Sequence, residues 1–233
     1  MGVLMEIIEG IHRIDEASNN MAHSNVYLVI YGKELVVIDT GTSGNAKKIV
    51  EYIQKIGHQP SEVSTIVLTH YHMDHAGSAK ELKDLTNAKV AVHVEDADFV
   101  AGKKPSPKPK NVLFRAFSSF IKPKPVEVDI ALKDGDKIAN FTVIGVAGHT
   151  PGSIVLFDAK RRALFAGDTL RFDGSKVTGA PKQFTWNEDK EKESIEKISM
   201  LEFDVMLPGH GEVLRAYASN KVKEFLASNG RAS

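Results

Sequence analysis

Four short segments of this sequence carry histidines and aspartates framed by glycine, proline or threonine. The first is the HxHxDH run at residues 69–75, and the others are residues 148–152, 166–169 and 207–211. Each follows an apolar stretch, and side chains on loops at strand ends are how rigid folds usually build catalytic sites. The candidate metal ligands in these segments are His70, His72, Asp74, His75, His149, Asp168 and His210.

The spacing within the first run separates its residues into two pairs. His70 and His72 are two apart, so in an extended segment both side chains point to the same side and can share one ion. Asp74 and His75 follow after the chain turns and can reach a second ion. Imidazole nitrogen and carboxylate oxygen are ligands that Zn²⁺ accepts. The run therefore predicts part of a two-metal site.

The three later segments can complete that site. Each ion still lacks a partner, and His149 and His210 are the remaining histidines on loops framed by glycine. The Asp168 carboxylate has two oxygens and can bridge both ions. We therefore predict two zinc ions as cofactors, although iron or manganese also accept nitrogen and oxygen ligands.

This ligand set predicts a metal-dependent hydrolase. Metal binding lowers the pKa of bound water to roughly 7, so a bridging hydroxide is available as nucleophile near neutral pH. It would attack a small-molecule ester, thioester, lactone or phosphodiester. Asp74 is the predicted catalytic residue, because its carboxylate could pass a proton to the departing atom.

Alternating strand and helix patterns surround these segments and favour an α/β or α+β fold. Two helices are predicted at 45–56 and 190–200, a third from Ser78, whose hydroxyl can cap it, and a last one at 216–227. A hairpin is expected at 25–38 and another at 154–165. The other expected strands lie at 7–14, 62–68, 89–94, 126–140, 141–146 and 205–207.

Residues 102–125 form a Lys/Pro-rich insertion in a chain otherwise predicted to be a single domain, 1–233. The insertion holds six lysines, Arg115 and five of the nine prolines, and no acidic residue. Its Phe114, Phe117 and Phe120 recur at helical spacing. The segment is either a lid that draws anionic substrates to the metals or a solvated insertion packed on the core or on a second subunit.

Composition excludes some classes of site. The sequence has no cysteine, so disulfides and thiolate-ligated metals are excluded. Thirty basic and thirty acidic residues cancel, which argues against nucleic acid as a partner. No segment approaches the roughly 20 apolar residues of a membrane span, and residues 1–10 lack the pattern of a signal peptide. We expect a cytoplasmic protein without a membrane partner; a homo-oligomer remains open.

The order HxHxDH, Gly-His, Gly-Asp and Pro-Gly-His resembles the metallo-β-lactamase superfamily over nearly the whole chain. The resemblance implies a four-layer αββα sandwich. It assigns His70, His72 and His149 to one metal and Asp74, His75 and His210 to the other, with Asp168 bridging. It also implies that Asp39, in Asp39-Thr40-Gly41, braces the histidine loop without binding metal.

The resemblance leaves alternatives open, since the same fold carries many activities. Asp168 counts against a true β-lactamase, and Phe172 stands where quorum-quenching lactonases have a tyrosine. A mononuclear iron oxygenase resembling persulfide dioxygenases is one alternative, and a binding protein stabilised by its metals is another. Phe184 and Trp186 could line an apolar pocket or belong to the core. His23 could approach the site from its rim, whereas structural or surface roles are expected for His12, His58 and His93.

Overall fold

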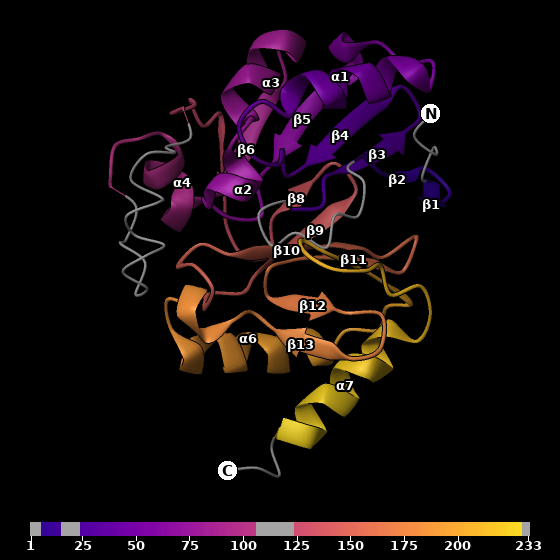
Figure 1. Ribbon diagram of the computed structural model, residues 1–233, viewed down its shortest axis with the longest axis vertical. Helices are drawn as coiled ribbons and strands as arrows, with labels where there is room; N and C mark the ends of the chain where they lie inside the picture. The colour runs from indigo at the N-terminus through magenta and orange to yellow at the C-terminus, as the bar shows by residue number, and fades with distance from the viewer. Residues whose placement is uncertain (1–5, 15–23, 106–123, 230–233) are drawn as a thin grey trace. The chain divides into compact units, whose positions relative to one another are not determined.

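The computed structural model describes residues 6–14, 24–105 and 124–229 of the chain. The chain divides into two compact units, Met1–Leu132 and Lys133–Ser233. Each unit has its own sheet and its own helices (Figure 1). The single domain expected from the sequence stays a prediction.

The first unit is built on a seven-stranded sheet with the order β1-β2-β3-β4-β5-β6-β7. Strands β1 to β4 pair antiparallel, and β4 to β7 pair parallel. The strands are β1 (Glu6–Ile8), β2 (Ile11–Arg13), β3 (Tyr27–Tyr31), β4 (Glu34–Ile38), β5 (Val63–Val67), β6 (Lys89–His93) and β7 (Ile130–Leu132). The helices are α1 (Ala46–Lys55), α2 (Met73–Ala76), α3 (Ala79–Thr86) and α4 (Val94–Val100), with a 3₁₀ turn η1 (Pro60–Glu62).

Helices α1 and α3 cover one face of this sheet (Figure 1). Ile49 and Ile53 of α1 lie one turn apart, so both reach the sheet, where they are fully buried together with Leu82 of α3. They pack on every second residue of the strands, such as Leu35 and Val37 of β4. The helix predicted at 45–56 is thereby confirmed, and Gly57, with φ of 88°, follows its end.

Two local predictions in this unit are wrong. Residues 7–14 do not form one strand, because Gly10, with φ of 72°, turns the chain and splits it into β1 and β2. Ser78 does precede α3, but its hydroxyl does not cap that helix. It donates to the carbonyl of Thr42 at 2.6 Å and accepts from the amide of Asn45 at 2.8 Å. The hydroxyl thus joins the start of α1 to the chain beyond α2.

The described ends of the 102–125 insertion lie against each other. Helix α4, which the sequence did not predict, leads into it, and the amide of Val126 donates to the carbonyl of Val100 at 3.1 Å. A Cβ added to Gly102 would lie 2.7 Å from Cγ of Pro125. The chain therefore leaves and rejoins the first unit at one place. The phenylalanines of the lid hypothesis lie outside the described residues.

The second unit is built on a five-stranded sheet with the order β14-β11-β10-β9-β8, in which only β11 and β14 are parallel. Its strands are β8 (Lys137–Ile138), β9 (Phe141–Gly145), β10 (Ile154–Asp158), β11 (Ala163–Gly167) and β14 (Val205–Pro208). A separate hairpin joins β12 (Leu170–Phe172) and β13 (Val177–Gly179). The remaining elements are a 3₁₀ turn η2 (Lys182–Phe184) and the helices α6 (Glu188–Ser199) and α7 (Ala218–Asn229).

Helices α6 and α7 pack on one side of the second unit's core. Ile195 and Ile198 of α6 and Val222 of α7 are buried with sheet residues such as Leu164 and Met206. The predicted hairpin at 154–165 is confirmed, with Asp158 opposite Ala163. Both units therefore combine a sheet with covering helices, which confirms the predicted α/β class.

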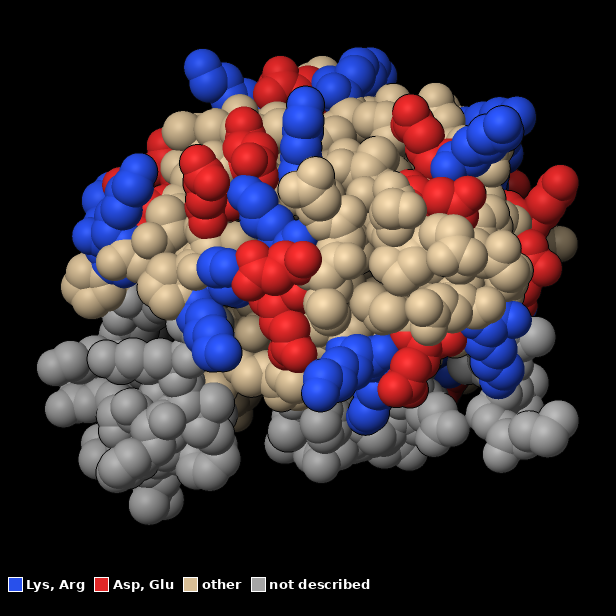
Figure 2. Space-filling model, turned by 90° about the horizontal axis from the view of Figure 1, so that it is seen from above, with Lys and Arg blue, Asp and Glu red and all other residues tan. Residues whose placement is uncertain are grey.

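The surface of one face carries both signs of charge. Figure 2 shows Lys and Arg side chains interspersed with Asp and Glu there, and neither sign forms a continuous patch. This mixture agrees with the formal net charge of zero. Among the described helices, none has the length and hydropathy needed to cross a membrane.

Candidate metal centre

The predicted ligands of the first unit lie together on the chain that follows β5. We name His70, His72, Asp74 and His75 the first ligand group. His70 Nε2 lies 3.1 Å from His72 Nδ1, as expected for two residues pointing to one side. The rings of His70 and His75 lie 4.1 Å apart between centroids, and His75 Nε2 is 3.8 Å from Asp74 Oδ2. This group is thus assembled within its own unit.

Asp39 holds the first ligand group in place. Its Oδ2 accepts from His75 Nδ1 at 2.7 Å and from the Thr69 hydroxyl at 2.8 Å, while Oδ1 accepts from the Thr69 amide at 2.8 Å. Donation from Nδ1 leaves His75 Nε2 as the metal-binding atom. These contacts agree with the bracing role expected for Asp39, whose φ of 58° turns the chain after β4.

Further contacts, which the sequence did not reveal, fix the same loop. The Ser24 hydroxyl donates to the carbonyl of Asp74, and the Thr40 hydroxyl donates to the carbonyl of His75 at 2.8 Å. Asp96, in the first turn of α4, accepts from the Tyr71 amide at 3.1 Å. Burial, together with the negative charge of Asp96, raises the pKa of the Tyr71 hydroxyl. Tyr71 therefore stays neutral and packs as an apolar ring against Phe99.

The predicted ligands of the second unit also lie together. We name His149, Asp168 and His210 the second ligand group. His149 Nε2 lies 3.6 Å from Asp168 Oδ2, and His210 Nε2 lies 3.5 Å from Asp168 Oδ1. One buried carboxylate thus has an imidazole beside each of its oxygens. A carboxylate in this position can offer one oxygen to each of two ions.

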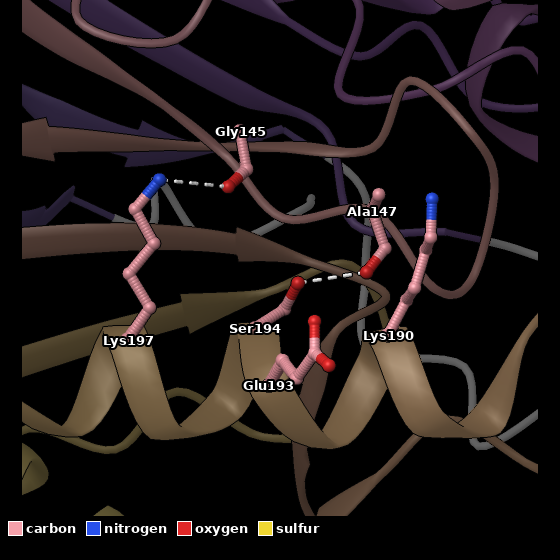
Figure 3. A pocket seen from close by; sticks show the side chains of 6 residues that line it. All are labelled: Gly145, Ala147, Lys190, Glu193, Ser194 and Lys197. Atoms are coloured by element: carbon pink, nitrogen blue, oxygen red, sulfur yellow. Dashed lines mark hydrogen bonds between the residues drawn. The ribbon is translucent and has the colours of Figure 1, made fainter.

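Helix α6 holds the loop that presents His149. The Ser194 hydroxyl donates to the carbonyl of Ala147 at 2.7 Å, and Lys197 Nζ donates to the carbonyl of Gly145 at 3.1 Å (Figure 3). These residues line a cavity of about 280 Å³ that contains no member of either ligand group. At the start of the helix, the amide of Trp186 donates to the carbonyl of His149 at 3.1 Å.

Gly148 permits the close approach of this loop to α6. A Cβ at Gly148 would lie 2.4 Å from Cα of Glu191, and the φ of Gly148 is 151°. We expect Gly148→Ala to lower the free energy of unfolding by about 1–3 kcal/mol and to displace His149. Gly179→Ala is the matched control, because its Cβ would make ordinary contacts of 3.5 Å with Ile195 and 3.6 Å with Glu191. Urea unfolding of both variants measures the difference, and equal stabilities would contradict the prediction.

Arg171 is a site residue that sequence reasoning missed. Its Nη2 lies 2.6 Å from Asp168 Oδ2, so a guanidinium compensates the buried carboxylate. Arg171 lies three residues after Asp168 on β12, within a hairpin that was not predicted. A basic residue shortly after the Gly-Asp segment was the available signal. The carboxyl of Glu191, which lies near Asp168, has a pKa raised by burial.

The spacing of donor atoms tests whether these groups suit a metal. Two ligands bound tetrahedrally to one zinc at about 2.1 Å are separated by about 3.4 Å. The His70–His72, His149–Asp168 and His210–Asp168 donors are 3.1, 3.6 and 3.5 Å apart. Nitrogen and oxygen donors at these separations fit a borderline divalent ion in both groups.

The other residues singled out in the sequence have different surroundings. Trp186 is 45% exposed, so it does not belong to the core, and Lys190 Nζ lies 5.2 Å from its ring centroid. His12 contacts the Tyr52 hydroxyl at 3.0 Å, and His58 contacts Glu62 at 2.9 Å. Phe184 is half-buried in η2. His93 accepts a hydrogen bond from the amide of Glu95 at the start of α4. His23 lies outside the described residues.

Many solved structures resemble the chain, and two of them illustrate the similarity. A metallo-beta-lactamase family protein of Thermus thermophilus matches 97% of this chain and 81% of its own, with a TM-score of 0.74 and 20% identity. The protein TTHA1623, solved in a di-iron-bound form, matches 83% of this chain and 90% of its own, with a TM-score of 0.66 and 27% identity. The fold expected from the resemblance is therefore confirmed.

Curated relatives are named as hydrolases. The probable metallo-hydrolase YflN of Bacillus subtilis is 27% identical over 90% of this chain and 87% of its own length. The human acyl-coenzyme A thioesterase MBLAC2 is 30% identical over 74% of this chain and 67% of its own. A family model described as the metallo-beta-lactamase superfamily matches residues 20–210. With its two ligand groups and its fold, the chain belongs to the metallo-β-lactamase superfamily.

Proposed function

We propose that the chain is a dinuclear metal-dependent hydrolase of small-molecule esters or thioesters. The observation that carries the proposal is the second ligand group, in which one carboxylate has an imidazole at about 3.5 Å from each oxygen. His149 would join His70 and His72 on one ion, and His210 would join Asp74 and His75 on the other. Asp168 would bind both ions. When bound, such ions activate water and polarise the acyl oxygen.

The chain's own residues would orient this chemistry. Asp39 keeps His75 in the tautomer that presents Nε2. Asp74 is the ligand best suited to proton transfer, because its side chain is 24% exposed, whereas that of Asp168 is 4% exposed. A partly exposed carboxylate can exchange protons with solvent and with a leaving group. The guanidinium of Arg171 would offset part of the negative charge of the Asp168 carboxylate.

The relatives support an acyl substrate. MBLAC2 is named an acyl-coenzyme A thioesterase, and its match covers two thirds of that protein. Lactones and phosphodiesters use the same metal chemistry and stay within the proposal as less favoured substrates. Zinc is the proposed metal, and iron is the runner-up, because the nitrogen and oxygen donors suit both and TTHA1623 was solved with two irons.

Metal analysis combined with a substrate panel tests the proposal. We expect purified protein to hold about two metal equivalents per chain by mass spectrometry and to lose turnover with a chelator. Adding back Zn²⁺ or Fe²⁺ to the metal-free protein identifies the active metal. The panel should contain matched ester, thioester, lactone and phosphodiester substrates. Full activity in metal-free protein would refute the proposal.

A further inference from the structure

A buried arginine in the first unit has two donor atoms without a hydrogen-bond partner among the described residues. Arg13, the last residue of β2, is 5% exposed. Its Nε and Nη1 atoms are buried and form no hydrogen bond with any described residue. Burying a guanidinium without a counter-charge is costly, and native proteins rarely retain such groups without a reason. Within the described part of the chain, Nε and Nη1 of Arg13 are therefore available to a bound anionic group.

The nearby carboxylate of Glu6 is engaged elsewhere. Glu6 pairs with His12 across β1 and β2, its Oε1 lies 3.9 Å from His12 Nε2, and it accepts from the Gly10 amide at 2.8 Å. Neighbouring residues on a strand point to opposite faces of the sheet. His12 reaches Tyr52 of α1, so it lies on the helix-covered face. Arg13 therefore lies on the opposite face from Glu6.

Strand register places Arg13 at the edge of the sheet that carries the first ligand group. Arg13 lies opposite Tyr27 of β3, and Tyr27 lies opposite Ile38 of β4. Ile38 in turn lies opposite Val67, the last residue of β5. Asp39 directly follows Ile38, and His70, the first histidine of the HxHxDH run, is the third residue after Val67. Arg13 is thus level with the ends of β4 and β5, after which Asp39 and the first ligand group follow.

A hydrogen bond also connects the chain before β3 to the first ligand group. The Ser24 hydroxyl, three residues before Tyr27, donates to the carbonyl of Asp74. The chain just before β3 therefore contacts the first ligand group through Ser24, while Tyr27, the first residue of β3, pairs with Arg13. A substrate held at the metal ligands and extending along this edge would approach the guanidinium.

We propose that Arg13 binds an anionic group of the substrate, a carboxylate or a phosphate, placed beyond the acyl bond that is cleaved. A guanidinium recognises both groups through charge-assisted hydrogen bonds. Nε and Nη1 of Arg13, which no described residue engages, would supply these bonds, and the bound anion would supply a counter-charge. The inference rests on the proposed hydrolase and narrows its substrates to negatively charged acyl compounds.

Matched substrates test the proposal. We expect Arg13→Met to lower kcat/KM for a carboxylate- or phosphate-bearing ester by about 10- to 100-fold, mainly through KM, and to change a neutral ester of equal length less than about 2-fold. Arg13→Lys should fall between. Comparing the two anionic esters shows which group is preferred. Arg162→Met, which removes an exposed arginine that pairs with Asp204, is the charge-matched control and should change neither rate.

Thermal unfolding supplies a readout that does not depend on turnover. Inorganic phosphate should raise the Tm of the wild-type protein and leave that of Arg13→Met unchanged. Without phosphate, Arg13→Met should unfold at the same or a higher temperature, because it removes a buried charge that no described residue neutralises. A lowered Tm with equal losses on charged and neutral esters would show a structural role and overturn the proposal. If the protein cleaves no ester but phosphate still raises the Tm of the wild-type protein alone, the proposed function would be wrong and the anion site would stand.

Discussion

Asp168→Asn is expected to abolish turnover and to release metal. The carboxylate lies within reach of both His149 and His210, and it is the proposed ligand of both ions. Replacing one oxygen by an amide nitrogen removes a charge and a ligand at once. We expect kcat/KM to fall by at least about 10³-fold, since metal charge stabilisation contributes several kcal/mol. Mass spectrometry should find fewer than two metal equivalents.

Asp158→Asn provides an unusually close control for this variant. Asp158 is also buried at the end of a strand in the same unit and also pairs with an arginine three residues later, Arg161, at 2.9 Å. It is not one of the predicted ligands. We expect this variant to lose stability and to keep its metal and its kcat. Equal metal loss in both variants would show that the effect comes from stability and not from coordination.

Asp39→Asn is expected to weaken metal binding about 10- to 100-fold without removing any ligand. Asp39 accepts from three donors, two on Thr69 and one on His75. An asparagine offers one acceptor oxygen and turns an amide donor toward one of these groups. The resulting unsatisfied group should also lower the free energy of unfolding by about 1–3 kcal/mol. Asparagine tolerates the left-handed backbone of this position, with φ of 58°, so the turn itself is kept.

Competition with a chromophoric chelator measures the metal affinity of Asp39→Asn, and urea unfolding measures its stability. Asp84→Asn removes the same formal charge from an exposed ion pair with Lys80 and should change neither quantity by much. Wild-type metal affinity in Asp39→Asn would exclude the bracing role.

The sequence was informative wherever a pattern is local. The HxHxDH run predicted that the side chains of His70 and His72 point to the same side, and His70 Nε2 lies 3.1 Å from His72 Nδ1. The spacing of Ile49 and Ile53 likewise predicted α1. Helix α4 was missed because it has only seven residues and begins after His93, whose ring accepts the capping hydrogen bond in place of a typical cap residue.

Tertiary contacts could not be predicted from local patterns in the sequence. Ser78 looked like a helix cap, and its hydroxyl instead joins two loops that are distant along the chain. Arg171 became meaningful only when β12 placed it beside Asp168. Arg13 is an ordinary strand residue in the sequence, and its burial, with Nε and Nη1 unbonded among the described residues, depends on the packing around β2.

The contact between Gly102 and Pro125 closes the 102–125 insertion at its base, so the insertion can differ in length without changing the strands on either side. Because the chain is closed there by backbone contact, the parallel strands β6 and β7 do not depend on the length of what lies between. Doubling the length of a flexible loop costs only about 0.6 kcal/mol in closure entropy. Exchanging this segment for one of another length should therefore leave the sheet of the first unit, and the ligand group that it carries, intact.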